Sequence, residues 1–291
     1  TTSGDIVITK KFEDCADGVA PEGVSFNDIQ FKLYVFDDGE KVYIKGTDGN
    51  DLIVSANEKG VEKFENLDPN DVYYIEEITN FDKYEGIEDS GAIILEEGEA
   101  INFKIVNKLK RGTIVVNKKW EGASGIPATA TLKITRNKTS DSDLNYSATV
   151  KTNEKGVAIF TDVPYGEYTI TEIDENGWVL KEEKIVTLDS EEIETEVENQ
   201  LSKGTVKILK KMNENDTVDG LSFHITGRGQ VVVKGTDGNY INTDLDVKIK
   251  IGKTDAQNEI TVNEGQLTND NIKIEKLDND SSALITLTDV Y

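Results

Sequence analysis

The sequence predicts an all-β protein assembled from repeated modules, and three observations support this prediction. Short runs rich in valine, isoleucine and threonine are bounded by Gly, Asn and Asp, which is typical of strands. No long stretch has apolar residues at helical spacing. Residues 107–118 (NKLKRGTIVVNK) read almost the same as residues 199–210 (NQLSKGTVKILK), so a joint recurs, and the module that follows it recurs too.

The composition excludes several classes of function. A net charge of −24 argues against nucleic-acid binding, which needs clustered Lys and Arg. One Cys allows no internal disulfide, so covalent reinforcement needs other chemistry. One His, one Cys and one Met leave almost nothing for a transition-metal site, and we expect no metal and no cofactor. No apolar run approaches the roughly 18 residues of a membrane span.

The recurring joints place module starts near Asp5, Gly112 and Gly204. A chain of 291 residues is long enough for two or three domains. We therefore expect three of them, at residues 1–110, 111–202 and 203–291.

The first strands of the three modules align without gaps. They are DIVITKKF (5–12), TIVVNKKW (113–120) and TVKILKKM (205–212). Successive side chains of a strand point to opposite faces. In each strand the first lysine of the Lys-Lys pair shares a face with the apolar residues; these lysines are Lys10, Lys118 and Lys210. Unpaired lysines are almost never fully buried, so their placement needs an explanation.

An acid and an asparagine also fall among the apolar residues of later strands in the first two modules. The acids are Glu77 in YYIEEI (73–78) and Glu172 in YTITEI (168–173). The asparagines, near the module ends, are Asn107 and Asn199. Each of these two modules therefore directs one Lys, one Glu and one Asn into its core.

A less specific interpretation exists for each residue alone. A single lysine in an apolar pattern is usually an edge residue whose ammonium reaches water. A single buried Glu or Asn is usually a hydrogen-bonded polar group of the core. Because the same three residue types recur in the same order in two modules, coincidence is a weak explanation. An unpaired buried charge costs several kcal/mol, so something must neutralise these groups.

These segments resemble the Cna-B-type domains of Gram-positive surface proteins and pilins. The matching pieces are ITKKF and VNKKW in the first strand, FTDVPYGEYTITE (160–172) before the second acid, and FKIVN (103–107) and TEVEN (195–199) in the last strand. The resemblance covers the first two modules and is strongest in residues 112–201. It implies tandem immunoglobulin-like β-sandwich domains in a linear rod. It also implies an intramolecular isopeptide bond between the first-strand lysine and a last-strand asparagine.

Carried over residue by residue, the resemblance implies cross-links Lys10–Asn107 and Lys118–Asn199, promoted by Glu77 and Glu172. Burial lowers the pKa of a lysine and raises that of a glutamate, so a neutral amine can act as nucleophile. The acid is expected to hydrogen-bond the asparagine carbonyl and to relay protons to the departing ammonia. The bond is made once, without turnover, so the chain is not an enzyme.

The third module departs from this pattern. Lys210 lies in the same phase as Lys10 and Lys118, but no Glu or Asn partner can be assigned to it. A long polar stretch precedes LITLTDVY (284–291), which resembles VAIFTDVPY (157–165). We expect an incomplete Cna-B-like domain with a long insertion, a core open along one edge, and Lys210 as an unpaired amine.

The implied function is structural: a cell-surface stalk or pilus-shaft segment, extracellular and anchored to the cell wall or built into a pilus. The partners implied are a sortase, other subunits of the assembly and a host ligand. The alternative is a ligand-binding adhesin module that uses the long segment 228–283 of the third domain.

Overall fold

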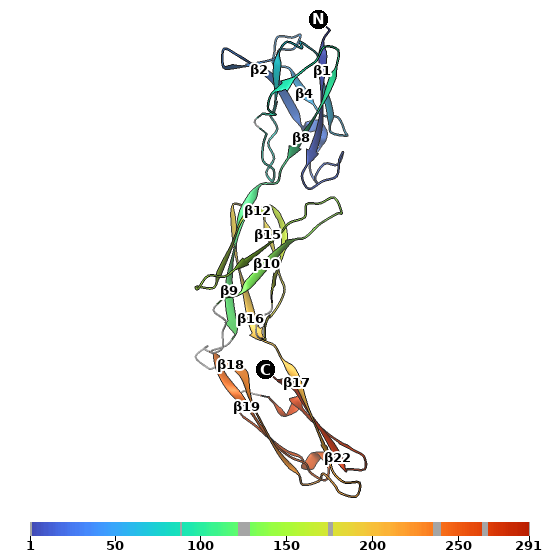
Figure 1. Cartoon of the computed structure of the whole chain (residues 1–291), viewed down its shortest axis with the longest axis vertical. Coiled ribbons are helices and arrows are strands. Elements are labelled where there is room, and N and C mark those ends of the chain that lie inside the picture. Colours follow the sequence, from blue (N-terminus) through green and yellow to red (C-terminus); the bar gives the residue numbers. More distant parts are fainter. Residues whose placement is uncertain are drawn as a thin grey trace.

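The chain folds into an elongated series of β-sandwich modules that follow one another along its length (Figure 1). The computed structural model describes residues 2–87, 89–121, 129–173, 177–234, 240–263 and 267–290, with the backbone alone at 228–234 and 240–243. Strands make up most of the described chain, and its few helices are single 3₁₀ turns. The prediction of an all-β tandem sandwich is confirmed.

The first module is a sandwich of two sheets. Its elements are β1 (Gly4–Phe12), η1 (Phe26–Asp28), β2 (Gln30–Asp37), β3 (Glu40–Tyr43), β4 (Ile53–Ser55), β5 (Val61–Leu67), β6 (Val72–Glu77), β7 (Ile93–Ile94) and β8 (Ala100–Asn107). One sheet has the order β5-β1-β8 and the other the order β3-β2-β6-β7, with β4 paired to β2. The inward residues of β1, including Ile6, Ile8 and Phe12, are fully buried between the sheets.

The second module repeats this plan. Its strands are β9 (Arg111–Glu121), β10 (Thr131–Arg136), β11 (Ser147–Lys151), β12 (Val157–Pro164), β13 (Gly166–Glu172), β14 (Trp178–Leu180), β15 (Lys184–Leu188) and β16 (Glu192–Leu201). The sheets have the orders β12-β9-β16-β14 and β11-β10-β13-β15. In both modules the first strand lies between an antiparallel neighbour and the parallel last strand.

The third module keeps only part of this plan. Its elements are β17 (Gly204–Lys211), β18 (Ser222–Lys234), β19 (Tyr240–Lys250), η2 (Asp255–Gln257), β20 (Glu259–Val262), η3 (Asn269–Asn271), β21 (Ile272–Leu277) and β22 (Ser282–Val290). The sheets have the orders β17-β22-β21 and β18-β19-β20. The long stretch expected as an insertion supplies β19, β20 and β21. Among the described strands β17 pairs only with β22, so its other edge has no parallel partner.

The joint between the first two modules makes backbone hydrogen bonds to both of them. Lys108 O accepts a hydrogen bond from Glu85 N at 2.8 Å, and Lys110 N donates to Lys83 O at 2.9 Å. On the other side Tyr165 N donates to Lys110 O at 2.9 Å. These backbone hydrogen bonds tie the joint to both of the modules that it connects.

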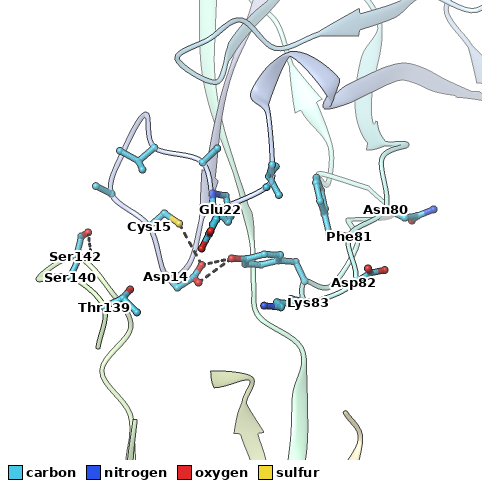
Figure 2. Close-up of a pocket in the computed structure, with 17 residues that line it drawn as sticks. Asp14, Cys15, Glu22, Asn80, Phe81, Asp82, Lys83, Thr139, Ser140 and Ser142 are labelled. Carbon is cyan, nitrogen blue, oxygen red and sulfur yellow. Dashed lines mark hydrogen bonds between the residues drawn. The ribbon is translucent and has the colours of Figure 1, made fainter. Parts of the chain in front are cut away.

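A cleft of about 670 Å³ lies beside this joint (Figure 2). Asp14 and the Tyr84 hydroxyl line its first-module side, where the hydroxyl donates to the two Asp14 carboxylate oxygens at 2.8 and 3.0 Å. Burial and neighbouring Asp14 raise the pKa of the Cys15 thiol to about 11, so this thiol is protonated at neutral pH. Thr139 and Ser140 line the cleft from the side of the second module.

Candidate functional site: two buried Lys-Glu-Asn clusters

The first cluster joins three strands of the first module. β1 and β8 run parallel in a register that pairs Lys10 with Ile105 and Phe12 with Asn107. Asn107 therefore lies one step diagonally from Lys10, and Lys10 Nζ contacts Asn107 Oδ1 directly. Glu77 comes from β6 of the facing sheet, and its Oε2 lies 3.6 Å from Lys10 Nζ. The Lys10 and Glu77 side chains are fully buried, and so is Asn107.

The second cluster has the same construction. β9 and β16 run parallel and pair Lys118 with Val197 and Trp120 with Asn199. Lys118 Nζ lies 2.8 Å from Glu172 Oε2, and both side chains are almost completely buried. Asn199 Oδ1 is buried and accepts no hydrogen bond from any residue that the structure describes. The structure thus brings together all six residues that the sequence analysis assigned to the two clusters.

The acid occupies a different place from the expected one. Asn107 Nδ2 donates to Glu77 Oε1 at 2.7 Å, and Asn199 Nδ2 donates to Glu172 Oε1 at 2.6 Å. We expected the acid at the asparagine carbonyl; in both modules it lies at the amide nitrogen instead. The carbonyl oxygen of Asn107, Oδ1, therefore faces Lys10, whose Nζ contacts it.

Burial shifts the ionisation of the clusters in the direction that favours reaction. Burial lowers the pKa of Lys10 to about 8, although nearby Glu77 opposes the shift. Burial raises the pKa of Glu77, against the opposing charge of Lys10. In the second module burial likewise lowers the pKa of Lys118, against the influence of Glu172. A proton can therefore pass from ammonium to carboxylate at lower free energy than in water.

Each cluster also contains an aromatic residue that was not predicted from the sequence. Lys10 Nζ lies 4.6 Å from the ring centroid of Phe12, and Lys118 Nζ lies 4.7 Å from that of Trp120. Each ring is two residues after its lysine and directly opposite its asparagine across the parallel pair. A ring face attracts the ammonium and excludes water. The signal was visible as an aromatic residue two positions after the lysine, where the third strand has Met212.

Lys210 shares a face of β17 with the half-buried Val206 and Ile208, as the sequence indicated, but this face is not covered as it is in the first two modules. Lys210 is exposed, as are Leu209 and Lys211 beside it. In the first two modules the parallel last strand and the acid-bearing strand cover the lysine, and the described part of the third module has neither next to β17 or β18. Without that cover, a position in the apolar phase of a strand remains in contact with water.

Residues 112–201 match the family model of the SpaA prealbumin-like fold domain. This match confirms, for the second module, the resemblance to Cna-B-type domains that the sequence indicated. The chain is therefore a tandem of β-sandwich modules with a SpaA prealbumin-like domain at its centre.

Several solved structures are similar at low sequence identity. The Bacillus anthracis TIE protein is 18% identical with a TM-score of 0.41; the match covers 91% of this chain, which spans only 48% of that protein. GBS52, the minor pilin of Streptococcus agalactiae, is 16% identical with a TM-score of 0.27, over 69% of this chain and 97% of that one. The major pilin SpaD of Corynebacterium diphtheriae is 16% identical with a TM-score of 0.32, over 62% and 53%. No curated protein matches the chain in sequence, and no helix in its described part is long and apolar enough to cross a membrane.

Proposed function

We propose that the chain is a structural stalk or pilus-shaft segment on the surface of a Gram-positive bacterium, with its first two modules each closed by a Lys–Asn isopeptide bond. The observation that carries the proposal is the repetition of one buried Lys-Glu-Asn cluster in one strand register in two modules. The similar structures include two proteins named as pilins, which fits this assignment. The partners that we propose are a sortase and the other subunits of a pilus or cell-wall assembly. The action is single-turnover, so the chain is not an enzyme.

The geometry of the clusters supports a reaction in three steps. A proton passes from Lys10 to Glu77, and the neutral Nζ attacks Cγ of Asn107. Nζ is in place for this attack because it already contacts the neighbouring Oδ1. A C–N bond forms as the bond from Cγ to Nδ2 breaks. Glu77, hydrogen-bonded to Nδ2, delivers the proton that lets this nitrogen leave as ammonia, and the resulting carboxylate takes the second proton of Nζ as the amide forms. Lys118, Glu172 and Asn199 perform the same steps, and each bond releases one ammonia.

The bonds give the rod its mechanical role. Each joins the first strand to the parallel last strand, and the linked residues Lys10 and Asn107 are 97 positions apart in the chain. A pulling force on the ends then passes through covalent bonds and bypasses most of the module. The hydrogen bonds of the sheets carry little of that load.

Mass spectrometry tests the proposal. The intact chain should weigh less than its sequence mass by two ammonias. Glu172→Ala should fold yet lose one of these two mass decrements, because the proton relay of the second module is gone. Glu167→Ala, which removes an exposed acid of the same strand, should keep both. A chain with the full sequence mass would refute the cross-links.

The alternative function, ligand binding through segment 228–283, stays a prediction. Its described part forms the end of β18, the strands β19, β20 and β21, and the start of β22. The side chains of 228–234 and 240–243 lie outside the described structure.

A further inference from the structure

An apolar, aromatic surface lies on the outer side of the first module, away from the Lys-Glu-Asn cluster. It belongs to the sheet β3-β2-β6-β7, whose inner side forms the core. Two cross-strand rows of side chains make it up. We call this surface the aromatic face; its residues are Tyr34, Phe36, Tyr43, Val72, Tyr74 and Ile94.

The rows follow from the strand register. Tyr34 is paired with Tyr43 on one side and with Tyr74 on the other. The Tyr34 and Tyr74 rings are stacked with centroids 5.3 Å apart, and Phe36 meets the Tyr74 ring edge-on at 5.0 Å. Val72 is paired with Ile94, which extends the apolar surface to the edge strand β7.

The solvent-exposed part of the aromatic face consists of Phe36, Val72 and Ile94, whereas Tyr34 is buried beneath its neighbours and Tyr43 and Tyr74 are half-buried. Phe36 is 53% exposed, and Ile94 is 67% exposed. Lys41 Nζ lies 4.0 Å from the Tyr34 ring centroid and 2.8 Å from Glu76 Oε2, which also accepts a 2.6 Å hydrogen bond from the Tyr43 hydroxyl. Phe36 is the exposed aromatic residue of this face, and an aromatic side chain held in place loses little conformational entropy on binding.

The second module shows that the fold does not need this surface. Its corresponding sheet has the order β11-β10-β13-β15. The outward residues of the two central strands there are polar: Lys133, Thr135, Thr169 and Thr171. Its large exposed apolar residues in the described structure are Ile185 on edge strand β15, at 56% exposure, and Ile173 directly after β13, at 57% exposure. The second module therefore forms this sheet without an aromatic cluster on its outer side.

Acidic residues border the aromatic face. Asp37, Asp38 and Glu40 form the β2–β3 turn next to Phe36, and Asp71 directly precedes Val72; all four are exposed. In a chain of net charge −24, a second copy would bring acids against acids. Like charges juxtaposed across an interface oppose association, so a partner of opposite charge is favoured.

We propose that the aromatic face is a docking site for a polypeptide that presents apolar side chains between lysines or arginines. The apolar side chains cover Phe36, Val72 and Ile94. The basic side chains pair with the acids of the β2–β3 turn. This site is independent of the isopeptide bonds, because its residues point away from both clusters.

The test measures binding of the whole chain to a fluorescently labelled synthetic peptide of alternating leucine and lysine, by fluorescence anisotropy. The double variant Phe36→Ser/Ile94→Ser should weaken binding about tenfold or more, as expected when central apolar contacts are lost. Ile185→Ser, the matched exposed isoleucine of the second module, should leave binding unchanged. A peptide of alternating leucine and glutamate should not bind.

Charge is tested separately. Asp37→Asn/Asp38→Asn should weaken binding of the leucine–lysine peptide more than Glu182→Gln/Glu183→Gln, which removes two exposed acids of the second module. All these positions are exposed, and unchanged thermal unfolding verifies the fold of each variant. Equal binding by all variants would mean attraction to net charge alone and would overturn the proposal. Concentration-dependent dimers in sedimentation, abolished by Phe36→Ser/Ile94→Ser, would assign the surface to a second copy and overturn it too.

Discussion

The second and third modules begin with nearly the same strand, yet their lysines end in opposite environments. In the second module β9 lies between β12 and β16, and the side chain of Lys118 is fully buried. In the third, β17 pairs with β22 in the way that β9 pairs with β12, but its other edge has no described partner, and Lys210 is exposed. The alternation of a strand decides which face a lysine occupies. The neighbouring strands decide whether that face is dry.

The glycines at the module starts show the same contrast. A Cβ on Gly112 would lie 2.6 Å from Ser190 O and 2.9 Å from Glu191 O, in the turn before the last strand. A Cβ on Gly204 would meet nothing closer than Val290 O at 3.9 Å. The turn that crowds the second module is therefore not present beside the third in the described structure.

The largest expected effect is the loss of a cross-link. Asn199→Ala should weigh only one ammonia less than its sequence mass, instead of two. It should also lower the free energy of unfolding of the second module by about 4 kcal/mol, because an unlinked chain gains more conformational entropy on unfolding than a cross-linked one. Denaturant unfolding measures the change. An Asn153→Ala control should keep both mass decrements, since Asn153 lies in an exposed turn. If Asn199→Ala still weighed two ammonias less than its own sequence mass, Asn199 would not be the cross-linking partner of Lys118.

The next effect is a pH dependence in an unlinked first module. In Asn107→Ala the Lys10 amine remains free, and its pKa is lowered to about 8 in the folded state from about 10.4 when unfolded. Between these values the unfolded state binds more protons, so stability should rise with pH. The gain is fully present above the unfolded pKa and is lost as the pH falls toward 8; it amounts to about 3 kcal/mol.

The matched measurement for this pH effect uses Lys10→Met/Asn107→Ala. That variant lacks the amine and should show no such rise between pH 8 and 10.5. Parallel pH profiles for the two variants would show that Lys10 is not buried as an amine.

A smaller effect sharpens the glycine comparison. Gly112→Ala should destabilise the second module by about 1–3 kcal/mol, since the new methyl group overlaps two carbonyl oxygens. Gly204→Ala should be tolerated in the third module. Thermal unfolding of the two variants would distinguish them, and an equal loss at both positions would mean that a strand also crowds Gly204.

The smallest effect is expected at Lys210. Lys210→Ala should change stability by no more than about 0.5 kcal/mol, as is usual for exposed positions. It should leave the intact mass decrement at two ammonias, whereas Lys118→Ala should reduce it to one. A branched peptide containing Lys210 in a digest would contradict this expectation.

Local sequence pattern was sufficient to locate most of the strands. Runs such as 5–12 and 113–120 lie within β1 and β9, because alternating β-branched residues on a half-buried strand encode both conformation and facing. The same alternation identified the Lys, Glu and Asn of each cluster. Their convergence could be anticipated only because the motif repeats, since no single strand indicates its neighbour in space.

What the sequence determined by itself was therefore the strands, the repeat and the inward phase of six polar residues. The tertiary structure decided the rest, because strand adjacency depends on contacts between distant segments. It placed Glu77 and Glu172 at the amide nitrogens of the asparagines. It left Lys210 in solvent, and it assembled an outward aromatic surface from residues of four strands, of which each strand supplies only one or two.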